Sequence, residues 1–349
     1  MSDHERLAAL ALDLVNIPSV SREEAAITSW MAERVEAVRH LQPDALVFGP
    51  PGPVDVVLAG HSDTVPAQGN LPGRLDGQFV HGLGACDMKG SLAVMLELAR
   101  DLAGARLNPL FVVFGREELP LAESVLDGLF DSCPELSEAR LVVMMEPTAN
   151  SIQAGCLGNI KADLEFSGVA AHSARPWLGE NAIHKAVLAL QAVATAAPQR
   201  VEIGGLEFKE VLSVTEIAGG IANNVIPDRV TCGLNFRYAG TRSPEQAEQR
   251  LRELVGPAGR LTVLSNAPGA PVNVENKLLE RLRRSGEEEE QLPLQPKQAW
   301  TPVAEFAQRG LDAVNFGPGD PELAHRRDER IAVEAMVANL HILRRFLCG

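Results

Sequence analysis

Several apolar runs of this 349-residue chain end in side chains that could bind a metal ion. His61 and Asp63 follow the first run, Glu117 and Glu118 follow the second, and Glu146 follows the third. Imidazole nitrogens and carboxylate oxygens together suit zinc or a similar first-row divalent ion, rather than calcium or magnesium alone. A carboxylate that bridges two such ions helps to turn water into a nucleophile near neutral pH. The residue types therefore indicate a hydrolytic metal centre.

Two further candidate ligands lie next to glycine-rich turns. Asp87 follows the turn at residues 82–84, just before a helical stretch, and His325 follows a fourth apolar run through residues 317–320. In open α/β sheets, ligands bind outside the carboxyl ends of the strands. If the four runs are parallel strands of one sheet, all these side chains gather at one edge of it.

The four runs are short and densely apolar, as buried strands are. They cover residues 54–59, 110–114, 141–145 and 313–316. Helical stretches such as residues 91–102 separate the first three, which predicts alternating strands and helices around a largely parallel sheet.

The N-terminal part of the chain is predicted to be helical. Ser21 and Glu24 have the spacing of a capping box, and apolar positions recur at helical spacing through residues 25–41. A block of four glutamates at residues 287–290 is predicted to be a solvated surface segment.

The middle of the chain has the pattern of a separate α+β domain. Strand-like and helical stretches alternate here, at residues 160–166, 181–196, 211–217 and 229–238, followed by a helix that begins at Ser243-Pro244. We therefore predict a catalytic domain formed by residues 1–158 and 268–349, with residues 159–267 inserted into it.

The composition excludes several classes of protein. Lysine and arginine number 32 against 46 acidic residues, so the net charge of −14 argues against nucleic acid as a partner. No apolar run reaches the length of a membrane span, and the charged N-terminus has no signal-peptide pattern. Five widely spaced cysteines without a CxxC motif predict reduced thiols, and hence a cytoplasmic protein.

Competing motifs fit the sequence less well. The stretch from Gly82 to Ser91 is not a Walker phosphate loop, because Met88 stands where a glycine should precede the lysine. No HExxH motif is present. Cys86 could be a nucleophile, but no histidine is marked as its base, and packing in the turn is the simpler interpretation.

Taken in order, these residues resemble the M20 family of dizinc amidohydrolases and peptidases. The resemblance covers the chain from about Ala59 onward and rests on five motifs, namely His61-Ser62-Asp63-Thr64-Val65, residues 84–90, Glu117-Glu118, Glu146-Pro147-Thr148 and His325. Further stretches, at residues 171–175, 181–185, 223–227 and 315–319, resemble the branch of the family that hydrolyses N-succinyl-LL-2,6-diaminopimelate.

The resemblance implies a fold and a metal site. The fold would be an α/β, zinc-exopeptidase-like catalytic domain with a mostly parallel mixed sheet, plus an inserted α+β dimerisation and lid domain. Asp87 would bridge two Zn²⁺ ions, for which Co²⁺ or Mn²⁺ could substitute. His61 and Glu146 would complete one metal site, and Glu118 and His325 the other.

The resemblance also implies roles in catalysis. Asp63 would orient the ring of His61, and Glu117 would be the general base. Glu117 and Glu118 can share the site only if the strand ends or bends there, because adjacent strand residues point to opposite faces. His172 would reach the partner subunit's site and stabilise the oxyanion.

Substrate-binding residues follow from the same resemblance. Arg175, Asn224 and Arg237 would hold substrate carboxylates, for which the planar guanidinium group is well suited. Gly317 would also contact the substrate. Arg116 and Pro302 depart from the family pattern, which leaves the acyl group and the amino acid open.

The expected protein is thus a homodimeric dizinc hydrolase of an N-acyl amino acid, with N-succinyl-LL-2,6-diaminopimelate as the expected substrate and no nucleic-acid or membrane partner. Two alternatives keep the same site, an N-acetylornithine-type deacylase and a metallo-exopeptidase. A third is a family relative that binds a ligand without turning it over.

Overall fold

The computed structural model describes residues 1–286 and 291–349, so the predicted acidic surface segment at residues 287–290 lies outside the described residues. The chain divides into two compact units. The first comprises Met1–Ala154, Asn273–Gln295 and Glu305–Gly349, and the second comprises Gly155–Val272 and Pro296–Ala304. The predicted domains assign residues 296–304 to the catalytic domain, whereas here they belong to the second unit.

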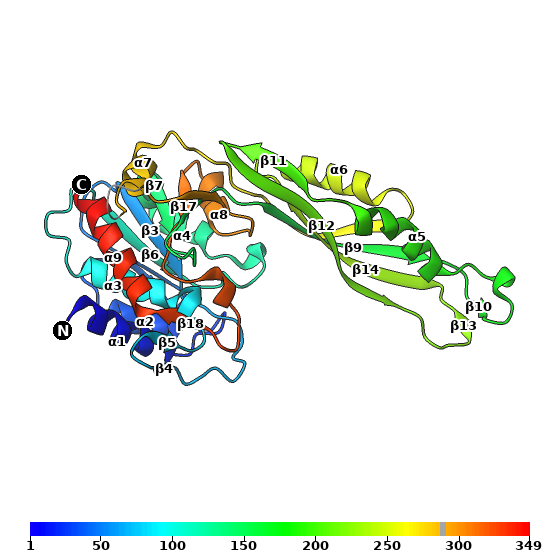
Figure 1. Ribbon diagram of the computed structural model, residues 1–349, viewed down its shortest axis with the longest axis horizontal. Coiled ribbons are helices and arrows are strands. Elements are labelled where there is room, and N and C mark those ends of the chain that lie inside the picture. Colours follow the sequence, from blue (N-terminus) through cyan, green and yellow to red (C-terminus); the bar gives the residue numbers. More distant parts are fainter. Residues whose placement is uncertain (287–290) are drawn as a thin grey trace. The chain divides into compact units, whose positions relative to one another are not determined.

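An eight-stranded mixed sheet forms the centre of the first unit (Figure 1). Its order is β1-β2-β6-β3-β7-β17-β8-β16. The strands are, in that order, Val38–Gln42, Ala45–Phe48, Pro109–Phe114, Val56–His61, Leu141–Met144, Ala313–Asn315, Ile152–Ala154 and Leu294–Pro296. The neighbours β6, β3, β7 and β17 run parallel, while β1, β2 and β8 pair antiparallel. The predicted α/β fold with a mostly parallel mixed sheet is confirmed.

The parallel strands correspond to the four apolar runs because they are buried on both faces. Every residue of β3, β6 and β7 is buried, so no alternation with polar residues is possible. Helix α3 (Gly90–Ala99) is almost entirely buried, and it packs against α1 (Asp3–Val15) and α9 (Val333–Cys348).

Shorter elements complete the first unit. The helices are α2 (Ala25–Ala32), α4 (Leu126–Ser132), α7 (Lys277–Arg283) and α8 (Val303–Gln308), of which α8 begins in the second unit. A small sheet has the order β18-β5-β4, from Arg330–Ala332, Phe79–His81 and Arg74–Leu75. Single helical turns lie at η1 (Ala85–Lys89), η2 (Leu121–Glu123), η3 (Pro134–Glu138) and η5 (Pro321–Leu323).

The predicted helix over residues 25–41 is wrong in its second half. Helix α2 ends at Ala32, Ala37 has a positive φ of 51°, and β1 begins at Val38. The antiparallel partner β2 holds this segment as a strand, which overrides the local helical spacing.

The predicted capping box is also wrong. No side chain caps α2, whose N-cap residue is Glu24. The hydroxyl of Ser21 donates instead to Asp63 at 2.7 Å. The carboxylate of Glu24 accepts from the main-chain N–H groups of Arg22 (2.8 Å) and Arg116 (3.1 Å). Both residues thus contact segments far away in the sequence.

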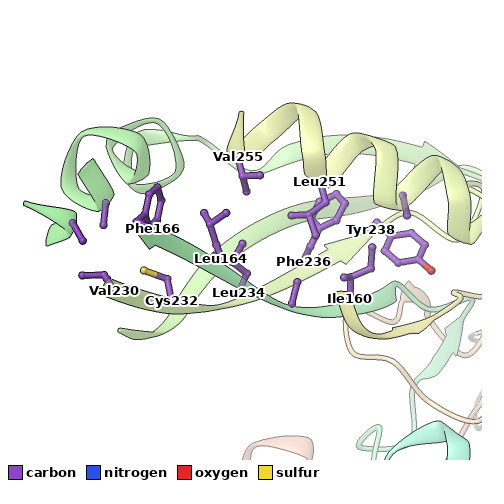
Figure 2. Close-up of a cluster of buried hydrophobic side chains, with 14 residues drawn as sticks. Ile160, Leu164, Phe166, Val230, Cys232, Leu234, Phe236, Tyr238, Leu251 and Val255 are labelled. Atoms are coloured by element: carbon purple, nitrogen blue, oxygen red, sulfur yellow. The ribbon is translucent and has the colours of Figure 1, made fainter. Parts of the chain in front are cut away.

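The second unit is a five-stranded antiparallel sheet with helices on one face. The order is β11-β12-β14-β9-β15, from Gln199–Ile203, Leu206–Gly219, Arg229–Tyr238, Gly158–Ser167 and Arg260–Ala267. Burial alternates along β9 and β14, because one face packs beneath helices α5 (Ala182–Thr195) and α6 (Pro244–Val255). Figure 2 shows this core, in which Phe166, Leu164, Phe236 and Tyr238 lie between the sheet and the helices.

The predicted start of α6 at Ser243-Pro244 is confirmed. Ser243 caps α6 with its hydroxyl, and Pro244 occupies the first turn. Asn181 caps α5 with its side chain. A two-stranded ladder of β10 (Ala171–His172) and β13 (Val225–Ile226), with the turn η4 (Pro176–Leu178), completes the unit.

Two global expectations can be compared with the described residues. All five cysteines are free, and four of them are buried. Within residues 1–286 and 291–349, no helix has both the length and the apolar character that crossing a bilayer requires.

Candidate metal centre and active site

The candidate ligands emerge from one edge of the first unit's sheet. His61 is the last residue of β3, which runs parallel to both β6 and β7. The segments that follow these strands, carrying Glu117, Glu118 and Glu146, therefore leave the sheet on the same side as His61. This is the gathering of strand ends that the sequence predicts.

The two carboxylate oxygens of Asp87 face two different histidines. Its Oδ1 lies 3.0 Å from Nε2 of His61, and its Oδ2 lies 3.4 Å from Nε2 of His325. The same nitrogen of His325 is 2.8 Å from Oε1 of Glu118. Ligand atoms of His61, Asp87 and Glu118 all lie within 4.8 Å of one another. The structure thus brings together four of the five predicted ligands through direct contacts.

The donor set fits a divalent transition-metal ion. Burial opposes protonation of His61, but hydrogen bonds to Asp63 and Asp87 outweigh it and hold the pKa of His61 well above its usual range. Burial likewise opposes ionisation of Asp87, yet the hydrogen bonds with His325 and His61 lower the pKa of Asp87. Hydrogen bonds to Asp87 and Glu118 raise the pKa of His325 to about 10. The negative charge of these carboxylates favours a cation between the two histidines, and imidazole and carboxylate are suitable ligands for such a metal ion.

Asp63 contacts His61 through its main chain as well as its side chain. Its carbonyl oxygen lies 3.0 Å from Nδ1 of His61, and its Oδ1 lies 3.5 Å from the same nitrogen. A carbonyl oxygen can only accept, so Nδ1 carries a hydrogen, and Nε2 is the ring nitrogen that faces Asp87. The predicted orienting role of Asp63 therefore has a geometric basis, with the carbonyl as the nearer partner.

The carboxylate of Asp63 also holds the turn that carries the two glutamates. Oδ1 accepts the N–H of Glu117 at 3.1 Å, and Oδ2 accepts the N–H of Glu118 at 3.2 Å. Strand β6 has already ended at Phe114, and Arg116 has a positive φ of 62°. The chain therefore leaves the alternating strand geometry before Glu117, as the shared site requires.

Glu117 has the electrostatic environment of a general base. Burial raises the pKa of Glu117 well above its usual range, and the neighbouring carboxylate of Glu146 raises it further. A carboxylate with a raised pKa takes up a proton more readily near neutral pH. The side chain of Glu146 is itself buried, close enough to Glu117 for their charges to interact.

Asp87 lies in a tight loop that a second acidic residue holds in place. The loop includes Gly84, with a φ of 74°, and the cis peptide between Asp87 and Met88. The buried carboxylate of Glu329 accepts main-chain N–H groups from Gly84 (3.0 Å), Cys86 (2.9 Å) and Asp87 (3.1 Å). No motif in the sequence identifies Glu329, although it follows His325 by only four residues.

Cys86 is a structural residue. Its buried thiol donates to the carbonyl oxygen of Asp320 at 3.0 Å. Burial and the nearby charge of Asp87 raise the pKa of the Cys86 thiol far above its usual range, so the nucleophilic thiolate is not formed. Packing in the turn is therefore the correct interpretation of this residue.

Gly317 lies against the segment that follows β7. A Cβ at this position would approach the carbonyl oxygens of Met145 and Glu146 to 2.4 and 2.5 Å, which no side chain could do without moving the backbone. The N–H of Gly317 donates to Thr148 Oγ1 at 3.0 Å. Gly317 thus packs beside a predicted ligand, and its contact with substrate stays a prediction.

Three predicted substrate residues lie together in the second unit. His172 pairs with Val225 across the short ladder, and its Nδ1 accepts the N–H of Ala174 at 3.1 Å. The N–H of Arg175 donates to the carbonyl oxygen of His172 (2.8 Å), and the N–H of Ser173 to that of Asn224 (2.9 Å). One compact segment therefore carries His172, Arg175 and Asn224.

Arg237 lies elsewhere in the same unit. It is near the end of β14, where it pairs with Asn159, and its Nε donates to Asn235 at 3.0 Å. Figure 1 shows β10 and β13 beyond the opposite end of this strand. From Arg229 to Arg237 the strand spans about 26 Å at about 3.3 Å per residue. The structure therefore separates Arg237 from the other three substrate residues.

Comparisons with known proteins agree with this site. A family model described as peptidase family M20/M25/M40 matches residues 57–348. A succinyl-diaminopimelate desuccinylase of Corynebacterium glutamicum is 35% identical over 356 residues, which cover 96% of this chain and 94% of the relative. A Mycobacterium tuberculosis H37Rv chain, provisionally named succinyl-diaminopimelate desuccinylase DapE, is 38% identical over 352 residues and 97% of each chain.

Solved structures of low sequence identity have the same fold. Aminopeptidase PepT from Bacillus cereus ATCC 10987 matches with a TM-score of 0.80 and 21% identity over 99% of this chain and 98% of its own. The YXEP protein of Bacillus subtilis, described as a dinuclear metal binding peptidase, matches with a TM-score of 0.72 and 16% identity over 99% and 98%.

Proposed function

The chain belongs to peptidase family M20/M25/M40, and on that premise we propose that it is a two-zinc hydrolase of N-succinyl-LL-2,6-diaminopimelate. The products are succinate and LL-2,6-diaminopimelate, an intermediate for lysine and cell-wall synthesis. The names of the relatives at 35–38% identity support the substrate. The observation that carries the two-metal centre is the position of Asp87, whose two oxygens face two different histidines.

The donor groups divide into two sets around Asp87. His61 and Glu146 would hold one ion, Glu118 and His325 the other, and Asp87 would contact both. Zn²⁺ suits these nitrogen and oxygen donors, and Co²⁺ or Mn²⁺ could replace it. When bound, the ions would lower the pKa of a water molecule between them and polarise the amide carbonyl.

Glu117 supplies the proton transfers. It accepts a proton from the attacking water and delivers it to the nitrogen of the leaving amine, so that it is unchanged after one turnover. Its raised pKa matches this task, since the same carboxyl group must both accept and donate near neutral pH. Asp63 keeps Glu117 in reach through its hydrogen bond to the Glu117 main chain.

The substrate carries carboxylates that need cationic partners. Arg175 and Arg237 are the proposed partners, with Asn224 as a neutral hydrogen-bond donor and His172 as the group that stabilises the oxyanion. The 26 Å along β14 corresponds to the extended length of about seven residues, which exceeds an N-acyl amino acid. One substrate molecule therefore cannot contact Arg237 and the segment of His172 in the same chain.

A homodimer resolves this separation. In a twofold dimer, one subunit can supply Arg237 and its partner can supply His172, Arg175 and Asn224 to the same site. Strand β12 supports this proposal. Its residues 211–219 pair with β14 along one edge, and none of the other described strands pairs with them along the second edge. Ile217 on β12 is exposed, and so are Val187 and Leu188 on α5, the helix that packs against β12. Their burial would favour association.

We place the reaction in the cytoplasm, which the free cysteines support. The test of the proposed function is hydrolysis of N-succinyl-LL-2,6-diaminopimelate by zinc-loaded protein, beside N-acetylornithine, dipeptides and a metal-stripped control. Metal-dependent release of succinate, faster than release of acetate, is the expected result. A clear preference for the acetyl compound or for a dipeptide would replace the substrate by that of a deacylase or an exopeptidase.

The same assay addresses the non-catalytic alternative. A protein that binds two metal ions per chain but releases no product from any of these compounds would be a binding relative. Its Glu117→Gln variant would then have no activity to lose.

A further inference from the structure

Glu329 contacts the loop of Asp87 in a way that the catalytic scheme does not use. We propose that Glu329 is a positioning residue that holds Asp87 between the two histidines and thereby sets the metal affinity of the centre. This inference rests on the proposed metal centre and adds to it a residue outside the ligand set.

Among the described residues, the hydrogen bonds of the Glu329 side chain go to main-chain N–H groups. Glu329 is only 2% exposed. Oε1 accepts the N–H groups of Cys86 (2.9 Å) and Asp87 (3.1 Å), and Oε2 accepts that of Gly84 (3.0 Å). Three donors of one loop, including that of the ligand itself, thus converge on one carboxylate. The position of the Asp87 backbone is therefore tied to Glu329.

Glu329 also ties this loop to the segment that carries His325. The N–H of Gly82 donates to the main-chain carbonyl oxygen of Glu329 at 3.0 Å. The next residues form β18, which pairs antiparallel with β5, the strand that leads into the loop. The side chains of Asp87 and His325 approach to 3.4 Å. Glu329 holds their two segments in fixed register through its hydrogen bonds with the main chain.

A charged carboxylate is the side chain that this position requires. Ionised glutamate only accepts hydrogen bonds, through two oxygens, and can satisfy all three N–H groups. Glutamine has one acceptor oxygen, and its NH₂ group would face at least one main-chain donor. The buried amine of Lys89 lies near enough to Glu329 to interact with its charge, and donates to the carbonyl oxygen of Ile17 at 2.8 Å. Burial raises the pKa of Glu329 to about 7, while the hydrogen bonds from the three main-chain N–H groups oppose this shift and stabilise the ionised form.

The decisive experiment is a metal titration of Glu329→Gln. Apoprotein is titrated with Zn²⁺ in competition with a chelator, and with Co²⁺ while its visible spectrum is recorded. Groups that orient metal ligands typically contribute about 10- to 100-fold to metal affinity. We expect a loss of that size, a changed Co²⁺ spectrum, and a kcat that recovers at high metal concentration while KM stays near the wild-type value.

Glu305→Gln is the matched control. Glu305 is a buried glutamate of the same unit, and its carboxylate accepts from Ser124 Oγ at 2.6 Å instead of from the loop of Asp87. This variant should bind both metals as the wild type does. Thermal unfolding of the three apoproteins checks that any loss of affinity in Glu329→Gln does not come from a loss of folded protein.

The outcomes separate this inference from the proposed function. Wild-type apoprotein that takes up no metal contradicts the metal centre itself. Wild type that binds metal, with folded Glu329→Gln binding as tightly, contradicts the role of Glu329. If Glu329→Gln does not fold, Glu329→Asp replaces it. Its shorter carboxylate cannot reach all three N–H groups, so an unchanged affinity would equally overturn the proposal.

Discussion

The carboxylate of Asp63 accepts a hydrogen bond from the main-chain N–H of Glu117 at 3.1 Å, while its main-chain carbonyl oxygen lies 3.0 Å from the ring of His61. One residue therefore orients both a predicted metal ligand and the predicted base. Because Asp63 is completely buried, neither hydrogen bond competes with bulk water. The relative position of ligand and base is consequently set before any substrate binds.

Glu117→Gln should separate catalysis from metal binding. The amide has the shape of the carboxyl group but cannot accept a proton from water, so kcat should fall by about 10²- to 10⁴-fold. Metal content and thermal stability should stay at wild-type values, since Glu117 is not among the proposed ligands. Steady-state kinetics and elemental analysis of the same preparation provide the check. Turnover close to that of the wild type would remove Glu117 from its role.

Removal of the metal should abolish activity and lower stability together. Dialysis against a chelator should leave a folded but inactive protein, and added Zn²⁺ should restore turnover. At a metal concentration 100 times Kd, each site should stabilise the folded state by about 2.7 kcal/mol, because the complete site exists only in the folded chain. Calorimetry with and without Zn²⁺ measures this difference. Full activity in a preparation free of metal would contradict the mechanism.

Mixing two inactive variants tests whether His172 acts across a dimer. His172→Ala and Glu117→Gln should each be nearly inactive alone. In a twofold dimer, random exchange of subunits makes half of the dimers mixed, and each mixed dimer has one site with both native residues. About a quarter of wild-type activity should therefore return. If His172 serves its own chain, no activity should return, provided that exchange is verified with tagged subunits.

Glu305→Gln should stabilise the protein in a manner that depends on pH. Burial raises the pKa of Glu305 from 4.5 to about 7, with Ser124 and Arg309 opposing the shift and Asp127 adding to it. The folded state holds the proton more tightly than the unfolded state. The carboxyl group of Glu305 therefore makes its full contribution to the free energy of unfolding below about pH 4.5. This contribution is lost as the pH rises through about 7.

Glutamine stays neutral and can still accept from the Ser124 hydroxyl. The gain in unfolding free energy of Glu305→Gln over the wild type should grow from pH 4.5 to 7 and reach at most about 3 kcal/mol. Urea unfolding of both proteins at pH 5 and pH 8 measures it. A difference that is the same at both pH values would contradict the assigned environment.

Glu24→Gln should impair turnover without affecting metal binding. The carboxylate of Glu24 accepts the N–H of Arg116, and it occupies the space where a Cβ of Gly115 would lie, at 2.7 Å. It therefore holds the turn that leads to Glu117. Because a displacement of about 1 Å can cost about 10²-fold in rate, we expect a fall in kcat of up to that size.

The control for Glu24→Gln is Glu123→Gln. Glu123 forms an ion pair with the side chain of Arg22, and the main chain of Arg22 in turn contacts Glu24. The hydrogen bonds of the Glu123 carboxylate go to Arg22 and not to the turn at Gly115. Its variant should retain wild-type kcat. Equal effects of the two substitutions would indicate general destabilisation instead of positioning.

The sequence predicted the elements whose burial depends on the local pattern. The apolar runs that became β3, β6 and β7 are buried on both faces, and that of β17 is mostly buried, so composition alone identifies them. Because parallel strands end at one edge, the positions of the candidate ligands followed from those strands. The approach of Asp87 to both histidines is consistent with that reasoning.

The roles of Glu24 and Glu329 could not be predicted because their partners are distant in the chain. Glu24 has the spacing of a helix cap, yet its carboxylate bonds to Arg116, which is 92 residues away. Glu329 bonds to Asp87 across 242 residues. A local pattern contains no information about such partners, so these roles became visible only in the folded structure.

The placement of His325 late in the chain has a consequence for biosynthesis. The four other proposed ligands all precede the second unit, whereas His325 is about 180 residues beyond Glu146. At about 5–20 residues per second, a ribosome needs roughly 10 to 35 s to synthesise that interval. A nascent chain therefore displays an incomplete set of ligands during this time, while the second unit has time to fold. Stable loading of the metal site that includes His325 must accordingly be a late step in the maturation of the protein.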